Sequence, residues 1–142
     1  MLSALKVGSE KEIEEILERI KGNGYKAALL DEEAVCCLEQ LEGAYFLAKK
    51  SVKEGKEISK NIGIEFLLWL SGSGHVENAI GKVGAKKKEN MVFVLFDGSE
   101  KEAGRKAGEI GLKVNGKVEK AGEKRKEEIK KIIEKMAISR IS

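Results

Sequence analysis

Side chains that usually carry catalysis or bind metals are rare in this sequence. The 142 residues contain two cysteines, one histidine and no proline, and the only aspartates are Asp31 and Asp97. A nucleophilic triad or a zinc site needs several such residues at suitable spacing. Because His75 is the single histidine and no CxxC motif occurs, we expect no catalytic residues, no metal site and no cofactor. This scarcity predicts a binding protein rather than an enzyme.

Long apolar segments are also missing. The apolar runs, such as Phe66 to Leu70 and Met91 to Phe96, are short, whereas a membrane-spanning helix needs about 20 residues. Residues 1–12 lack the apolar stretch of a secretory signal peptide. We therefore expect a cytoplasmic protein without a membrane partner. Hydrophobic residues make up 42% of the chain and charged residues 36%, which predicts a folded core and excludes a disordered chain or a disulfide-stapled miniprotein.

The charge is distributed unevenly along the chain. The net charge is +3; residues 99–142 have a net charge of +5, while residues 1–98 have −2. A basic C-terminal third of the chain is able to bind nucleic acid. The simpler interpretation, which charge alone favours, is a solvated helix face.

Hydrophobic spacing predicts an α/β fold. Strands are expected at residues 2–7, 26–30 and 91–96, the last apolar on both faces and therefore interior. Residues 112–118 are either a further strand or a small Asn-Gly hairpin. Helices are expected over residues 13–22, from Asp31 to Gly55, from Glu57 to Leu70, over 76–83, around 103–110 and around 129–136. The prediction is a single domain over residues 1–142, with a small mixed or antiparallel sheet packed with about six helices.

Local signals suggest how some of these helices begin. Ser9 and Glu12 have the spacing of a capping box, and Asp31 is placed to cap the next helix. Cys36 and Cys37 fall within the helical pattern that follows Asp31, where buried thiols are the usual outcome. We expect them not to pair, because the side chains of neighbouring residues diverge.

The segment Ser71 to His75, with the sequence SGSGH, lies between two predicted helices and supports two interpretations. Uncovered backbone N–H groups at a helix start form an anion site, to which the serine hydroxyls and His75 would add contacts. The alternative is a tight turn capped by Ser73, which the local chemistry favours. The adjacent Trp69 is either a core residue or a wall for a stacked base, and we favour the core. Glu65, within the apolar helix, needs a buried partner and is expected to orient the turn rather than to catalyse.

Residues 62–84, IGIEFLLWLSGSGHVENAIGKVG, resemble the small regulatory subunit of the archaeal and eukaryotic KEOPS complex. The pattern of that family is a Glu before an apolar helix, a Leu-Ser/Ala-Gly turn, a Thr/Ser-Arg-Gln-Ile-like segment and an amphipathic helix ending in Gly. The chain length, the order of helices, the upstream segment AYFLAKKSVKEGKEI and the strand MVFVLF fit the same family.

The resemblance implies a non-catalytic subunit with two partners, the small KEOPS kinase/ATPase and the single-stranded 3′ CCA end of tRNA. Such a subunit supports the formation of threonylcarbamoyl-adenosine in tRNA. The expected kinase-binding residues lie on the 76–83 helix: Val76, Ala79, Ile80 and Val83. The expected RNA-binding residues are Ser71, Gly72, Ser73, His75, Lys49 and Lys60.

The sequence departs from the family pattern at two positions of the turn. Gly74 replaces the basic residue and His75 replaces Gln. The loss of a cation at Gly74 leaves a phosphate contact to be supplied by a nearby lysine, for which the candidates are Lys49, Lys50, Lys60, Lys82 and Lys86. Two other hypotheses remain open: a small-molecule anion sensor at the SGSGH helix start, and a small enzyme built around His75.

Overall fold

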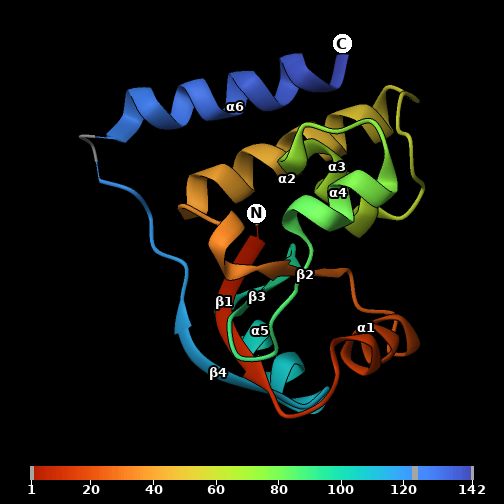
Figure 1. Ribbon diagram of the computed structural model, residues 1–142, viewed down its shortest axis with the longest axis vertical. Helices are drawn as coiled ribbons and strands as arrows, with labels where there is room; N and C mark the ends of the chain where they lie inside the picture. The colour runs from red at the N-terminus through yellow and green to blue at the C-terminus, as the bar shows by residue number, and fades with distance from the viewer. Residues whose placement is uncertain (1, 123–124, 142) are drawn as a thin grey trace. The chain divides into compact units, whose positions relative to one another are not determined.

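The computed structural model describes residues 2–122 and 125–141, with side chains up to Ile138, and its elements are shown in Figure 1. Within these residues it has four strands and six α-helices. The chain forms two compact units, Met1–Val35 with Gly84–Val118 and Cys36–Val83 with Glu119–Ser142. No helix of the described residues is both long enough and apolar enough to cross a membrane.

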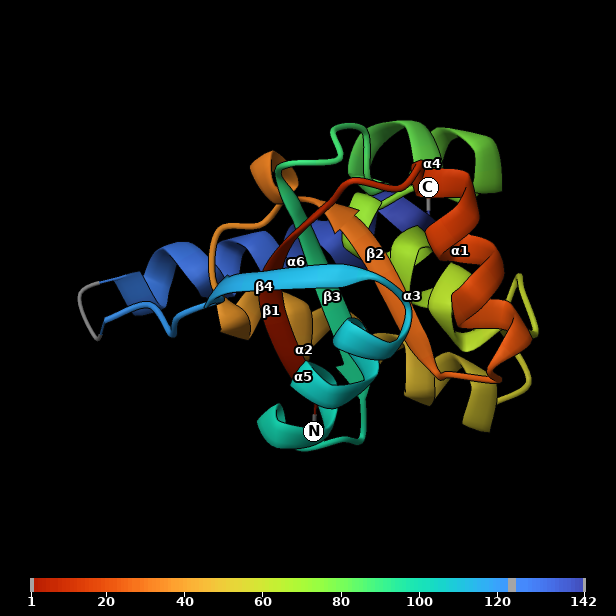
Figure 2. The same ribbon diagram turned by 90° about the horizontal axis from the view of Figure 1, so that it is seen from below.

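The first unit is built on a four-stranded antiparallel sheet in the order β2-β3-β1-β4 (Figure 2). This confirms the α/β fold class and the antiparallel form of the expected sheet. The elements of the unit are β1 (Leu2–Ser9), α1 (Ile13–Gly22), β2 (Ala27–Asp31), the 3-10 helix η1 (Glu32–Ala34), β3 (Met91–Phe96), α5 (Glu100–Glu109) and β4 (Leu112–Lys117).

The core of this unit joins one face of the sheet to α1 and α5. Phe93 pairs with Leu5 of β1 and with Leu29 of β2, and the three side chains pack with Ile16 of α1 and Ala103 of α5. All six residues of β3 are buried, so the expected interior strand is confirmed. A buried strand between two others has every backbone group paired, which makes β3 the centre of the unit.

The Asn-Gly pair does not form a hairpin. Val7 pairs with Val114 and Lys6 with Gly116, so Asn115 has no partner in the register and β4 carries a bulge. Residues 112–117 therefore form an edge strand, and the strand alternative for this segment is confirmed.

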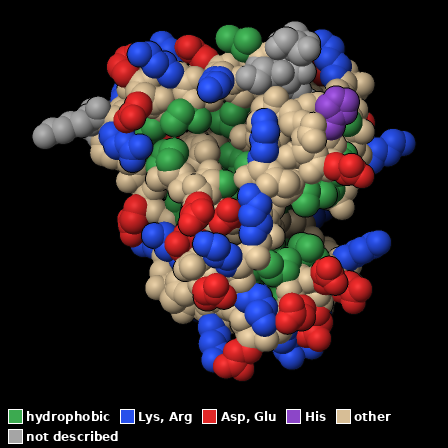
Figure 3. All heavy atoms as spheres, viewed as in Figure 1, with side chains coloured by type: hydrophobic (Ala, Val, Ile, Leu, Met, Phe, Trp, Pro, Cys, Tyr) green, Lys and Arg blue, Asp and Glu red, His purple; other side chains and the backbone are tan. Residues whose placement is uncertain are grey.

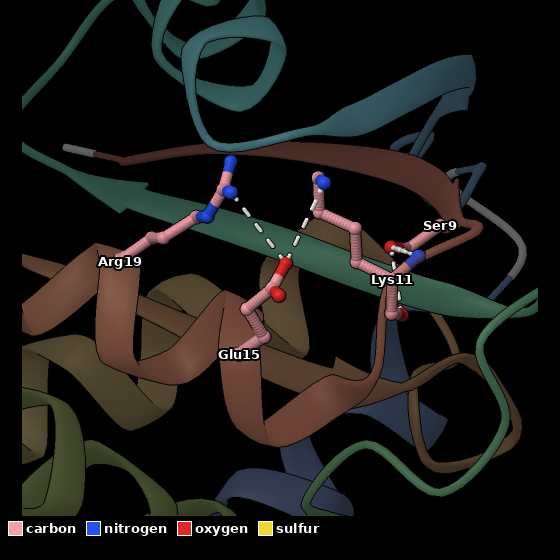
Figure 4. Close-up of polar contacts among 4 residues, drawn as sticks. All are labelled: Ser9, Lys11, Glu15 and Arg19. Atoms are coloured by element: carbon pink, nitrogen blue, oxygen red, sulfur yellow. Dashed lines mark hydrogen bonds and ion pairs between the residues drawn. The ribbon is translucent and has the colours of Figure 1, made fainter.

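The expected capping box at Ser9 is wrong. Ser9 is the last residue of β1, and its hydroxyl group accepts a hydrogen bond from the Lys11 backbone N–H over 2.9 Å (Figure 4). The N-cap of α1 is Glu12, which makes no side-chain capping bond. On the next turns Glu15 forms ion pairs with Lys11 at 3.6 Å and with Arg19 at 3.5 Å. The serine hydroxyl thus closes the strand-to-helix turn instead of capping the helix.

The second unit consists of helices packed around α3 (Figure 1). Phe66 and Leu68 of α3 are completely buried, as its apolar composition predicts. Gly43 lets α6 approach α2 closely, because a Cβ atom at this position would lie 2.8 Å from the Ile133 side chain. The helices of the unit are α2 (Leu38–Lys53), α3 (Ile62–Ser71), α4 (Val76–Val83) and α6 (Lys126–Ile141).

Two expected helix starts lie too early in the sequence. Asp31 does not cap the long α2; its carboxylate accepts from the Glu33 N–H and caps η1, while α2 begins only at Leu38. The next helix, α3, begins at Ile62 rather than near Glu57, with the Asn61 side chain accepting from the Ile64 N–H at 3.1 Å.

Cys36 and Cys37 lie before α2 and outside the helix, contrary to expectation. Cys37 is buried and Cys36 is exposed, and both are free thiols. Their sulfur atoms nevertheless converge, with the two Sγ atoms 3.2 Å apart in a thiol–thiol hydrogen bond. The expected divergence of the side chains is therefore wrong.

Burial, and next the hydrogen bond to Cys37, raise the pKa of Cys36 from 9.0 to about 11. The folded chain thus holds this proton more tightly than the unfolded chain. The resulting stabilisation is complete below pH 9 and is lost as the pH rises toward 11. We expect the thiolate absorbance of a Cys37→Ser variant to titrate above pH 9 but below the wild-type midpoint. A wild-type midpoint at 9 would contradict this assignment.

Candidate functional site

A buried carboxylate organises the second unit. Glu65, on the first turn of α3, is completely buried, and its two oxygens accept four hydrogen bonds. Oε1 accepts from the backbone N–H groups of Ile58 at 3.0 Å and Ser59 at 3.1 Å. Oε2 accepts from the Ser51 hydroxyl at 2.7 Å and from Trp69 Nε1 at 3.0 Å. We call these five residues the Glu65 cluster.

The Glu65 cluster joins α2, the segment before α3, and α3 itself. Because Glu65 has no exposed surface, it cannot reach a substrate in solution. The carboxylate is instead the common acceptor of two backbone N–H groups, the Ser51 hydroxyl and the Trp69 indole N–H, which is a structural contribution. The structural role expected for Glu65 agrees with this geometry, but the carboxylate binds the N–H groups of Ile58 and Ser59 before α3 and not the turn after it.

The SGSGH segment is a compact turn between α3 and α4. Gly72 ends α3 in the left-handed conformation with φ of 70°, which glycine adopts without strain. The Ser71 hydroxyl donates to the Leu68 carbonyl and accepts from the Ser73 N–H. The Ser73 hydroxyl accepts from the His75 N–H at 3.1 Å. Both serine hydroxyl groups are therefore engaged inside the turn.

The structure brings only some of the expected RNA-binding residues close to one another. Ser71 and Gly72 are half-buried, Ser73 is buried, and Gly74 and His75 are exposed. Lys60 precedes α3, so it lies at the opposite end of this helix from the turn, about 15 Å away along the axis. Lys49 lies on α2 with its ammonium group 4.7 Å from the centre of the Tyr45 ring.

Charge alone does not mark a binding face. In the view of Figure 3, Lys and Arg side chains are interspersed with Asp and Glu, so this face has no extended region of one sign. Lys86, a candidate to replace the missing cation at Gly74, forms an ion pair with Asp31 at 3.7 Å. Its neighbour Lys88 pairs with Glu12 at 3.0 Å. These lysines line a cavity of about 470 Å³ beside the start of α1, and their charges are already compensated there.

The four expected partner-binding residues differ in burial. Ala79 and Val83 are buried, while Val76 and Ile80 are 37% and 46% exposed. A spacing of four residues places Val76 and Ile80 on one side of α4. The helix therefore has a partly exposed apolar pair beside the buried Ala79 and Val83, on the same face by helical spacing.

A second cavity, of about 430 Å³, lies wholly within the second unit and was not predicted. Trp69 forms part of its wall, and the indole N–H is held by Ser51 Oγ at 3.1 Å as well as by Glu65. The other lining residues come from the second half of α2, the segment after it, and α6: Leu47, Lys50, Ser51, Glu54, Lys56, Ile58 and Ala137. The sequence carries no local signal for this grouping, because the segment Lys56 to Ile58 was expected to begin a helix.

Within the residues that the structure describes, no group of three or more His, Cys, Asp and Glu side chains is placed to hold a metal ion. The accessible features are an exposed turn, an apolar pair on α4 and a cavity with an aromatic wall. The fold thus places the chain in the class of small α/β proteins built on a four-stranded antiparallel sheet.

A family model described as kinase binding protein CGI-121 matches residues 6–141. The chain belongs to this family, and the assignment based on residues 62–84 is confirmed. The match extends over both compact units. A comparison with curated proteins finds no match.

Proposed function

We propose that this protein is a non-catalytic accessory subunit of the KEOPS tRNA-modifying complex. It binds the small kinase/ATPase of that complex and the 3′ CCA end of tRNA, and so supports the formation of threonylcarbamoyl-adenosine. The observation that carries the proposal is the match to the kinase binding protein family over residues 6–141. In this role residues 1–142 act as one regulatory-subunit domain.

The exposed side of α4 supports the kinase-binding part. Val76 and Ile80 expose aliphatic surface on a helix that is anchored by the neighbouring buried residues Ala79 and Val83. An amphipathic helix with a fixed backbone is a suitable anchor for a partner protein, because little side-chain order is lost on binding.

The RNA-binding part is supported by the start of α4. His75 and Gly74 are exposed, and the first N–H groups of a helix have no partners within the helix. The backbone carbonyl of His75 accepts the first intrahelical bond, from Ala79 at 3.0 Å. Because both serine hydroxyls are engaged in the turn, the contacts to RNA come from backbone N–H groups and His75. The anion-sensor alternative loses its two hydroxyl donors for the same reason.

The geometry also constrains how an RNA strand would be bound. Lys60 and the turn lie about 15 Å apart along α3, so one phosphate cannot contact both. A strand of several nucleotides along this unit can reach both, and Lys49 or Lys50 replaces the cation that is missing at Gly74.

The proposal is tested with the purified chain against the small KEOPS kinase/ATPase, against intact tRNA, and against tRNA without its 3′ CCA. We expect a complex with the kinase, and tRNA binding that falls at least about tenfold on trimming and weakens with salt. Equal, strongly salt-dependent binding of both RNAs would show electrostatic attraction only and would contradict the RNA-binding part. Absence of a kinase complex would contradict the other part.

A further inference from the structure

The 430 Å³ cavity beside Trp69 has the composition of a small-molecule site. Its volume falls within the range of sites for ligands of this size. One part of its wall is apolar, formed by Trp69, Leu47, Ile58 and Ala137. Trp69 is fixed in place, because its indole N–H donates to both Ser51 and Glu65. A fixed aromatic ring is a suitable surface for a flat ligand, since no rotamer entropy is lost when the ligand stacks.

Ile58 in this wall is unusually accessible. Its side chain is 50% exposed, although its backbone N–H is fixed by Glu65. A large aliphatic group that stays in water at the mouth of a cavity is covered favourably by a planar ring.

The rim of the cavity carries the charges that an anion needs. Lys50 and Lys56 both line it, and within the described part of the chain neither forms an ion pair. Glu54 is the one acidic residue in the lining, so the two ammonium groups leave the rim with a net positive charge. The nearest comparable lysine, Lys49, does not line the cavity and lies over the Tyr45 ring instead.

Glu57 adds a hydrogen-bonding requirement to the same segment. It lies between the lining residues Lys56 and Ile58, and its Oε2 atom is buried without a hydrogen-bond partner in the described residues. A buried acceptor without a donor is unfavourable. Glu57 itself is not among the lining residues, so the choice of a nucleobase rests on the flat wall formed by Trp69 and not on this acceptor.

We propose that this cavity binds one unpaired nucleotide, with its base against Trp69 and Ile58 and its phosphate at Lys50 and Lys56. The nucleotide is either free in solution or the end of a single-stranded RNA. The second source rests on the RNA-binding part of the proposed function, whereas the first does not.

Trp69 is the only tryptophan of the chain, so its fluorescence reports directly on this cavity. The full-length protein is titrated with AMP, adenosine, inorganic phosphate and a short single-stranded oligoribonucleotide. We expect saturable quenching by AMP, weaker binding of adenosine and no response to phosphate. An oligonucleotide that binds at least about tenfold more tightly than AMP identifies an RNA end as the source. Equal or weaker binding identifies a free nucleotide.

Two lysine variants on the same helix form a matched pair. Lys50→Ala should weaken AMP binding about three- to tenfold, while Lys53→Ala, at an exposed position that does not line the cavity, should change it less than about twofold. Ile58→Glu places a carboxylate in the cavity without removing a buried side chain, and should abolish the quenching while the circular dichroism spectrum stays unchanged.

The outcomes separate this inference from the proposed function. The cavity assignment is overturned if neither AMP nor the oligonucleotide quenches Trp69, if phosphate alone quenches equally, or if Lys53→Ala and Lys50→Ala have the same effect. It is also overturned if Ile58→Glu binds AMP normally, while tRNA binding by the wild type would still support the proposed function. If AMP quenches but tRNA does not bind, the cavity assignment stands and the RNA-binding part of the proposed function fails.

Discussion

Replacing Glu65 by alanine should lower the free energy of unfolding of the second unit by about 3 to 5 kcal/mol. The change leaves the N–H groups of Ile58 and Ser59, the Trp69 indole N–H and the Ser51 hydroxyl without their common acceptor. The Ser51 hydroxyl keeps the Ala48 carbonyl and the indole N–H keeps Ser51 Oγ as acceptors, so the main loss is at the N–H groups of Ile58 and Ser59. Each such donor without a partner costs about 1 to 3 kcal/mol, and water entering the vacated space recovers part of that loss. Denaturant unfolding followed by Trp69 fluorescence measures the effect in this unit.

Two further variants show whether the hydrogen bonds are responsible. Glu65→Gln keeps the shape and one acceptor oxygen, so its stability should lie between those of the wild type and Glu65→Ala. Glu77→Ala removes an exposed glutamate from the first turn of α4 and should cost less than about 1 kcal/mol. If Glu65→Ala were no less stable than Glu77→Ala, the Glu65 cluster would not be what holds the unit together.

A Val76→Asp, Ile80→Asp double variant should bind the kinase/ATPase at least about tenfold more weakly than the wild type. Both side chains are exposed on one side of α4, so the substitutions place two charges where a partner would bury aliphatic surface, without disturbing the core. Calorimetric titration of the kinase into each variant measures the dissociation constant, and circular dichroism verifies the fold.

Leu17→Asp is the matched control for the docking surface. Leu17 on α1 is 46% exposed, the same fraction as Ile80, but it belongs to the other compact unit. It should leave the affinity for the kinase within about twofold of the wild type. Equal losses in Leu17→Asp and the α4 variant would mean that general surface hydrophobicity, and not α4, controls the interaction.

The sequence pattern was sufficient to predict the bounds of those helices and strands whose apolar residues follow one clear spacing. The bounds of α1, α4 and β3 agree with the prediction, because each is fixed by its own apolar spacing and by a glycine or turn at its end. The family, too, was readable from residues 62–84, since the Glu, the Ser-Gly turn and the apolar helix are contiguous in sequence.

The start of α3 could not be predicted from local apolar spacing. Residues 57–61 have helical apolar spacing, but the buried Glu65 carboxylate takes the N–H groups of Ile58 and Ser59. That contact requires Ser51 and Trp69 to be in place around the same carboxylate, which is a tertiary condition. The same condition holds Lys56 and Ile58 in the wall of the cavity.

The sequence by itself determined the fold class, the family and the turn between α3 and α4, because these depend on the order and spacing of neighbouring residues. Only the tertiary structure decided which of the apolar residues on α4 stay exposed, that Cys36 and Cys37 converge, and that Lys50, Lys56 and Trp69 line one cavity. These features depend on which surfaces the packed helices cover, and an amphipathic pattern does not specify the neighbour that covers it.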